Sequence, residues 1–241
     1  MEKYFFDIII YFALYSFIGW VIETIYNSIK KKEFVNRGFL SGPFCPIYGF
    51  GAILIIQVFA VFNNSFSIVS NNIFIQIFVA MILTTILEYI TGYILEKMFN
   101  CKWWDYSDFF LNLHGRVCLQ YSIYWGILSY ILINLIHPII IKYVSFLNIS
   151  IKMFINVFII LYFIFDTIKS VTEIIDLRKI VLRQYKKPLE NFYGQIIQYK
   201  RIFQAFPKLK FKKIGKLNQE IREYLQNEFK KIKIKVKEKV R

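Results

Sequence analysis

Five long apolar runs followed by a polar stretch make up the hydrophobic pattern of this chain. The runs cover residues 5–29, 44–62, 73–95, 117–141 and 151–172. A helix needs roughly 20 apolar residues to cross the hydrocarbon core of a bilayer. The pattern therefore predicts an all-α membrane protein with about five transmembrane helices. Lys30, Lys31 and Lys32 follow the first run, which is typical of a stop-transfer signal and not of a cleaved leader.

The charge of the chain is concentrated after the last apolar run. The chain carries a formal net charge of +15, and residues 174–241 hold 20 Lys and Arg against 6 Asp and Glu. This division predicts a transmembrane helix bundle over 1–173 and a basic, mostly helical cytoplasmic tail over 174–241. Positive charge stays on the cytoplasmic side of a membrane. Lys and Arg in the first loop, the third loop and the tail therefore predict an outside N-terminus and an inside C-terminus.

Apolar residues in the tail recur at helical spacing. Ile196, Ile197 and Phe203 form one such set, and Ile221 and Tyr224 belong to a second. Basic amphipathic helices beside a membrane bind anionic lipid headgroups, which is the partner that we expect for the tail. No nucleic-acid-binding motif accompanies the charge, so no nucleic acid is expected. Residues 231–237 alternate strictly between basic and apolar, a pattern that fits a strand or a frayed helix.

Ionisable side chains inside the apolar runs are the candidates for chemistry, because a charge within a bilayer is costly. Glu23 lies in the first run, Glu88 lies in the third, and Arg116 opens the fourth. We expect these three residues to converge in one polar cluster in the inner half of the membrane. The cluster could be a working site or a structural brace. Glu96 and Asp166 are expected to pair with Arg116 or with nearby lysines and to hold helices together.

Two further segments are candidates for a cavity or for a structural motif. The first runs from Asn36 to Gly51 and is rich in glycine and proline, so it could line a cavity or form a tight turn before a close-packed helix. The second runs from Lys102 to Arg116, and its two tryptophans predict an interfacial belt. Asp105 is expected to pair with Arg116 across this loop. The loop could also form a short helix that lies on the inner surface of the membrane. The candidate residues are Arg37, Gly42, Pro43, Pro46, Tyr48, Gly49, Gly51, Trp103, Trp104, Asp105 and Asn112.

Motifs of soluble enzymes and of metal sites do not occur in the sequence. It contains no phosphate-binding GxxxxGK[ST] loop, no HExxH and no GxSxG. Cys101, His114 and Cys118 could be drawn as metal ligands, but a fourth ligand is missing. The sequence predicts neither a metal nor another cofactor.

The order of several short motifs resembles a known bacterial membrane family, described as putative ABC-transporter type IV or CmpB-like permease. The resemblance covers roughly residues 10–140 and rests on the segments YSFIGW at 15–20 with Glu23, NRGFL at 36–40, GPFCPIYGFG at 42–51, LEY at 87–89, LEK at 95–97, WWDYS at 103–107 and NLHGR at 112–116.

The resemblance implies a permease of the bacterial cytoplasmic membrane. Such a permease would need a separate ATPase subunit, since this chain has no nucleotide-binding motif. In this interpretation Glu23 and Glu88 face a central cavity, and Arg116 balances their charge. One alternative is a membrane-embedded, lipid-handling enzyme in which the carboxylates act as general acid and base. Another is a regulatory or structural membrane subunit without catalytic activity.

Overall fold

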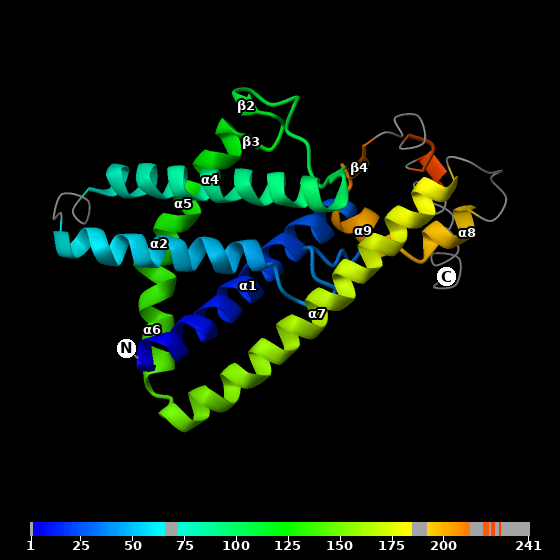
Figure 1. Ribbon diagram of the computed structural model, residues 1–241. Helices are drawn as coiled ribbons and strands as arrows, with labels where there is room; N and C mark the ends of the chain where they lie inside the picture. Colours follow the sequence, from blue (N-terminus) through cyan, green and yellow to red (C-terminus); the bar gives the residue numbers. More distant parts are fainter. Residues whose placement is uncertain are drawn as a thin grey trace, which may run out of the picture.

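The computed structural model describes residues 2–65, 72–184, 192–212 and, within 219–227, all except 222, 225 and 226. The described chain is dominated by long apolar helices (Figure 1). These are α1 (Glu2–Lys31), α2 (Pro46–Ser65), α4 (Ile73–Phe99), a continuous segment of α5 (Leu119–Ile131), the π-helix η1 (Leu132–Ile136) and α6 (His137–Ser145), and finally α7 (Ile149–Gln184).

The prediction of an all-α membrane protein with about five spanning helices is confirmed. Among the described residues, four helical segments are long and apolar enough to cross a membrane, and α2 contributes a shorter apolar stretch over Pro46–Val61. Large apolar side chains lie on the outer surface of the bundle, including Phe74 at 79% exposure and Phe158 at 58%. Such exposure is unfavourable in water and is expected where a surface faces lipid.

The helices pack in a row that partly follows the order of the chain. Helix α1 lies between α2 and α7, and α4 lies between α2 and α5 (Figure 1). The lower part of the α5–α6 segment returns to α1, where the Tyr15 hydroxyl lies 2.6 Å from Nδ1 of His137. This contact joins the middle of α1 to the fourth spanning segment.

Small and polar residues allow α4 and α5 to approach each other closely. On α4 the buried residues recur every fourth position: Ala80, Thr84, Glu88, Gly92 and Glu96. The buried residues of α5 are Ser122, Gly126 and Ser129. A Cβ at Gly126 would lie 2.9 Å from the carbonyl oxygen of Ile77, so no larger residue fits there without a shift. Close helix packing through small residues is the usual arrangement within membranes.

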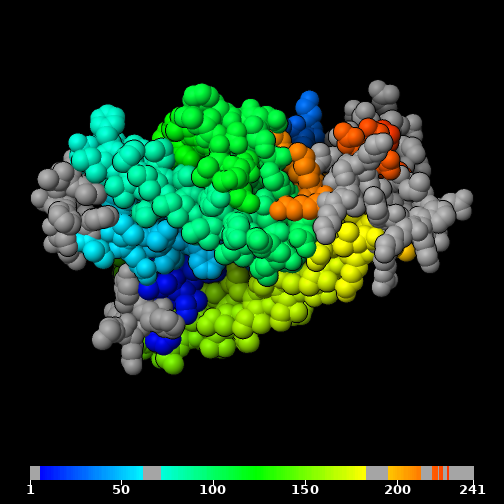
Figure 2. Space-filling model, turned by 45° about the horizontal axis from the view of Figure 1, so that its top comes forward, coloured from blue at the N-terminus to red at the C-terminus, as the bar shows by residue number. Residues whose placement is uncertain are grey.

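The tail folds back on one end of the bundle, which we call the tail end: the connections 32–45 and 100–118 lie here together with residues 192–212. Helices α8 (Phe192–Ile197) and α9 (Lys200–Ala205) lie beside α7, and strand β4 (Lys210–Phe211) pairs antiparallel with β1 (Cys101–Lys102). In Figure 2 the orange tail residues lie between the green α4–α5 region and the yellow end of α7.

An apolar core holds the tail in this position. Ile196 and Ile202 are buried together with Leu177, Val181 and Trp103. Helix α7 continues without interruption through the expected domain boundary at residues 173 and 174. The apolar tail positions Ile196 and Ile202 are thus used within the protein, and the tail shares its core with the bundle.

The α4–α5 connection forms a hairpin instead of the short surface helix that the sequence suggested. Strand β2 (Asn112–Leu113) pairs with β3 (Val117–Cys118), and Leu111 and His114 adopt positive φ angles of 49° and 55° at its turns. The side-chain amide of Asn112 donates hydrogen bonds to the backbone carbonyls of Ser107 and Phe109, and these bonds brace the hairpin. Residues 231–237, for which the sequence left strand and helix open, lie outside the described residues.

Candidate functional site

Glu23 forms the centre of a polar group between α1 and the start of α2. Its carboxylate accepts a hydrogen bond from the Tyr48 hydroxyl at 2.9 Å and pairs with Nε of Arg37 at 3.2 Å. Asn27, one turn further along α1, donates a third bond at 3.1 Å. The Glu23 side chain keeps 30% of its surface exposed. This carboxylate is therefore paired with a cation and is still accessible.

Glu88 occupies a different environment on α4. It is 5% exposed, and it accepts bonds from the Tyr106 hydroxyl at 3.3 Å and from Nε1 of Trp125 at 3.2 Å. Both donors are neutral. Among the contacts of the described residues, no Lys or Arg pairs with Glu88. A carboxylate that is buried among neutral groups in a spanning helix is unusual, because it lacks the cation that normally offsets its burial.

An aromatic contact links the two carboxylates. The ring of Tyr48, which bonds Glu23, lies 4.9 Å from the ring of Trp125, which bonds Glu88. The chain Glu23–Tyr48–Trp125–Glu88 therefore joins α1, α2, α5 and α4. We call these four residues and Arg37 the central polar group.

Arg116, which was expected to converge with Glu23 and Glu88, contacts other groups among the described residues. Its Nη2 lies 2.7 Å from Glu96, and its Nη1 donates to the Tyr89 hydroxyl at 3.1 Å. Lys212 of the tail reaches the same Glu96 carboxylate at 3.3 Å. Glu96 is thus a brace between α4, the hairpin and the tail, as the sequence suggested for this residue. Arg37 takes the role beside Glu23 that was expected of Arg116.

The glycine- and proline-rich segment forms a turn and then a close-packed helix. Phe44 donates its N–H to the Gly42 carbonyl across Pro43 at 2.9 Å, and Pro46 begins α2, where its missing N–H costs nothing. A Cβ at Gly49 would lie 2.3 Å from Oγ of Ser16, so α1 and α2 touch here. Gly51 is less restricted, since its Cβ would lie 3.6 Å from Leu87. Among the described residues of this segment, the groups that reach a carboxylate of the central polar group are Arg37 and Tyr48.

Asp166 binds the backbone of this turn and is not paired with a lysine as expected. Its carboxylate accepts the N–H groups of Ser41 at 3.1 Å and Gly42 at 2.9 Å. It is 4% exposed. Backbone donors satisfy the buried carboxylate and fix the turn against α7.

The two adjacent tryptophans belong to the tail-end core and not to an exposed interfacial belt. Trp103 is 2% exposed and contacts the ring of Phe206 at 4.8 Å, while Nε1 of Trp104 donates to the Arg116 carbonyl at 2.7 Å. Asp105 does not pair with Arg116; it pairs with Lys210 at 2.6 Å and with Lys102 at 3.6 Å. Burial alone would raise the pKa of Asp105, but Lys210, the Ser107 donors and Lys102 hold this pKa below its ordinary range.

The family described as putative ABC-transporter type IV matches residues 10–171. The chain belongs to this family. The match includes every residue of the central polar group. It also covers the apolar helical segments from residue 10 of α1 to Val171 of α7, and it ends before the tail residues that cover the tail end. Membership of the ABC-transporter type IV family makes this chain a transport-related membrane protein. No solved structure matches the chain.

Two members of the site were missed from the sequence. Trp125 and Tyr106 both bond Glu88. An indole or phenol in or beside an apolar run is most often a packing or interfacial aromatic, so neither residue was a candidate from the sequence. The signal that could have found them is that a buried Glu88 needs hydrogen-bond donors. Trp125 on α5 and Tyr106 in the connection 100–118 supply these donors. Groups of three or more His, Cys, Asp or Glu residues that could hold a metal do not occur in the described part of the chain.

Proposed function

We propose that this chain is the permease subunit of a transporter that is driven by a separate ATPase. We further propose that Glu88 holds a proton or a positively charged part of the cargo. The observation that carries this proposal is the burial of Glu88 with neutral donors alone. The family membership supports a role in transport, and the absence of a phosphate-binding loop from the sequence is the reason for a separate ATPase.

The contrast among the carboxylates explains why Glu88 is singled out. Glu96 and Glu23 each have an arginine within 3.2 Å, as expected of charges that hold helices together. An ionised group at the centre of a spanning helix costs about 2.5–3.5 kcal/mol on insertion scales. A brace would include a cation, as at Glu96, or a pair of backbone donors, as at Asp166, to offset this cost. Glu88 has neither, and such a carboxylate is suited to take up a positive charge during a working cycle and to release it later.

The orientation that we propose places the tail end on the cytoplasmic side of a bacterial plasma membrane. Its support is that the connections 32–45 and 100–118 and the tail contain Lys and Arg, whereas the connection 66–72 contains none. An ATPase would then approach the tail end. We also propose that the tail is attracted to anionic lipid headgroups, and the support for this attraction is the net positive charge of the tail. The exposed tail lysines at 208, 210 and 212 already pair with carboxylates of this chain.

The test uses the full chain, purified from its native membrane and reconstituted in vesicles with any ATPase subunit that accompanies it. We expect an ATPase subunit to co-purify and cationic solutes or protons to be taken up on addition of ATP. Glu88→Gln should reduce this uptake by tenfold or more, about the effect of losing one charge-assisted contact, without lowering the unfolding midpoint. Glu96→Gln is the matched control and should lower the midpoint.

Two results would contradict the proposal. One is the failure of any ATPase to accompany the intact protein. The other is a Glu88→Gln protein with normal uptake or with the same loss of stability as Glu96→Gln, since Glu88 would then be a brace.

A further inference from the structure

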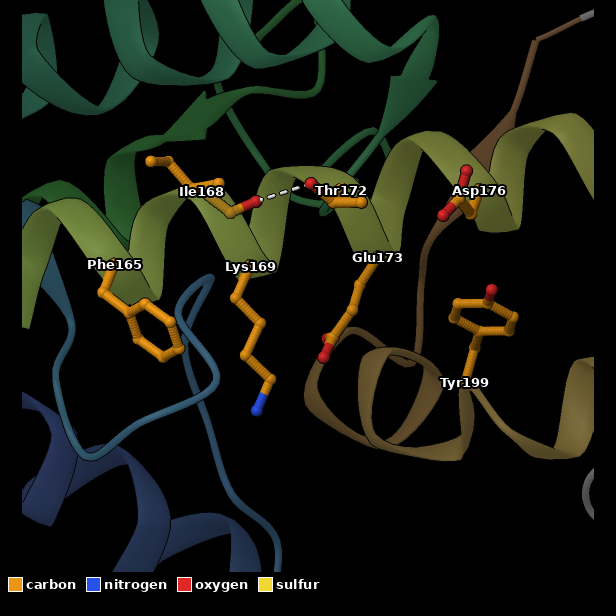
Figure 3. A pocket seen from close by; sticks show the side chains of 7 residues that line it. All are labelled: Phe165, Ile168, Lys169, Thr172, Glu173, Asp176 and Tyr199. Carbon is orange, nitrogen blue, oxygen red and sulfur yellow. Dashed lines mark hydrogen bonds between the residues drawn. The ribbon is translucent and has the colours of Figure 1, made fainter.

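The outer face of α7 changes from apolar to charged within one helical turn. Phe165 and Ile168 are 71% and 62% exposed, as expected of side chains that touch lipid. The next positions on the same face are Lys169, Thr172 and Glu173, spaced three and four residues apart (Figure 3). Such a change marks the depth at which hydrocarbon gives way to lipid headgroups.

A pocket lies at this depth, between α7 and the tail. It has a volume of about 370 Å³, and Tyr199 of the tail forms its far wall opposite α7 (Figure 3). A second hollow of about 330 Å³ shares Lys169, Glu173 and Tyr199 with it and extends towards Ser41 and Arg201. Pockets that hold small ligands measure about 300–1,000 Å³. The joined space is large enough for a phosphate with its attached glycerol.

The charges around the pocket leave one cation available. Glu173 accepts a bond from the Ser41 hydroxyl at 3.2 Å and lies 3.6 Å from Arg201, and Asp176 pairs with Lys179 at 3.0 Å. Both carboxylates that line the pocket therefore already have a cation partner. The Lys169 ammonium has no ion pair or hydrogen bond among the described residues, and its side chain is exposed.

Tyr199 supplies a neutral donor on the opposite wall of the pocket, across from α7 (Figure 3). Burial and the neighbouring Asp176 and Glu173 carboxylates raise the pKa of Tyr199, so its hydroxyl keeps its proton at neutral pH. The Thr172 hydroxyl already donates to the Ile168 carbonyl at 2.8 Å, which leaves its oxygen free only to accept. The pocket therefore offers an ammonium and a phenol to an anionic oxygen, and an acceptor to a hydroxyl.

We propose that this pocket binds the phosphate group of one phospholipid from the leaflet at the tail end. Lys169 and Tyr199 bind the phosphate oxygens, and the acyl chains lie along Phe165 and Ile168. A free phosphate has the same anionic chemistry, but it would leave these two apolar side chains unused. The site differs from a diffuse attraction of the basic tail, because it has one cation and a defined volume. It depends neither on transport nor on the central polar group.

The test measures lipid binding to the full-length protein in detergent. Phosphatidylglycerol is titrated, and the bound lipids are counted by native mass spectrometry. Lys169→Gln should weaken the tightest lipid about tenfold or more, as for the loss of a hydrogen bond to a charged group, and Lys169→Arg should retain it. Lys97→Gln is the control. Lys97 is an exposed lysine in the last turn of α4, at the tail end of the bundle, and its ammonium lies 5.6 Å from the centre of the Tyr93 ring. It should leave the tightest lipid in place.

The remaining arms of the experiment decide between the sources. Diacylglycerol, which lacks the phosphate, should not compete for the site, and inorganic phosphate should compete only weakly. Equal losses of lipid in Lys169→Gln and Lys97→Gln would overturn the proposal in favour of general surface attraction. Full displacement by millimolar inorganic phosphate would overturn it in favour of a small-anion site. Unchanged unfolding midpoints for the variants confirm that these comparisons are made on folded protein.

Discussion

Breaking the pair between Glu96 and Arg116 tests how the tail end is held together. Both side chains are largely enclosed, with 5% and 14% of their surfaces exposed, and the joining distance is 2.7 Å. Removing one partner of a buried pair costs about 3–5 kcal/mol, because the other charge stays buried without compensation. Arg116 cannot lose its proton at accessible pH, so Glu96→Gln should reach this range.

The opposite substitution should cost less. After Arg116→Gln, Glu96 still has Lys212 at 3.3 Å, and the half-exposed Lys212 side chain can move closer. We expect a loss of about 2–3 kcal/mol, below the range for a fully uncompensated charge. The double variant should be more stable than the sum of the two single effects predicts. Contacting charges of this kind show coupling energies of about 0.5–3 kcal/mol.

Equilibrium unfolding in mixed micelles measures these free energies for the four proteins of the cycle. The exposed pair Asp176 and Lys179, whose side chains are 44% and 60% exposed, provides a matched control cycle. Its substitutions should each change stability by about 0–1 kcal/mol. If the Glu96 and Arg116 effects add without coupling, or if they are no larger than those of the control pair, the argument from burial is refuted.

Three further predictions follow from the packing, the tail contacts and the charge distribution. Gly49→Ala should destabilise the protein by about 1–3 kcal/mol, because the new Cβ would overlap Ser16, whereas Gly51→Ala should be nearly neutral. Thermal unfolding of the two variants tests this, and equal effects would contradict the close approach of α1 and α2. The pKa of Asp105 is lower in the folded protein than in the unfolded chain. Its stabilising contact with Lys210 is therefore fully present at pH values above the unfolded-state pKa of about 3.9, and it is lost as the pH falls through the folded-state pKa. A spin label on the tail should therefore gain mobility at low pH, and Asp105→Asn should show that mobility at neutral pH already; a label insensitive to both changes would refute the anchoring role. Reporter fusions after residue 68 and after the C-terminus should report opposite sides of the membrane, and the same side for both would exclude the proposed orientation.

The spanning helices could be predicted from the sequence because their signal is local. Each run of about 20 apolar residues indicates a spanning helix, whatever its neighbours are. The turn before α2 was also accessible as one of two alternatives, since Pro43 and Pro46 restrict the backbone wherever they occur.

Partners of charged and apolar side chains were harder to predict. Glu23 had Arg37 and Arg116 as possible cations, and only the packing of helices selects Arg37 at 3.2 Å. The apolar spacing of Ile196 in the tail fits a lipid surface as well as a protein core, and the structure shows the protein core. Trp103 was misassigned for the same reason, because an amphipathic ring at a membrane interface and one in a core have the same sequence signal.

The antiparallel pairing of β4 with β1 has a consequence for the order of synthesis. Lys210 is made 105 residues after Asp105, and chains grow at about 5–20 residues per second. For several seconds the α4–α5 connection is therefore complete while its tail partner is still on the ribosome. During this interval Trp103 lacks the ring of Phe206 that later packs against it. A nascent chain that stops between residues 184 and 206 has all of the described membrane helices but lacks Phe206, so Trp103 keeps only its ring contacts with Phe39 and Phe99 and the tail end stays partly uncovered.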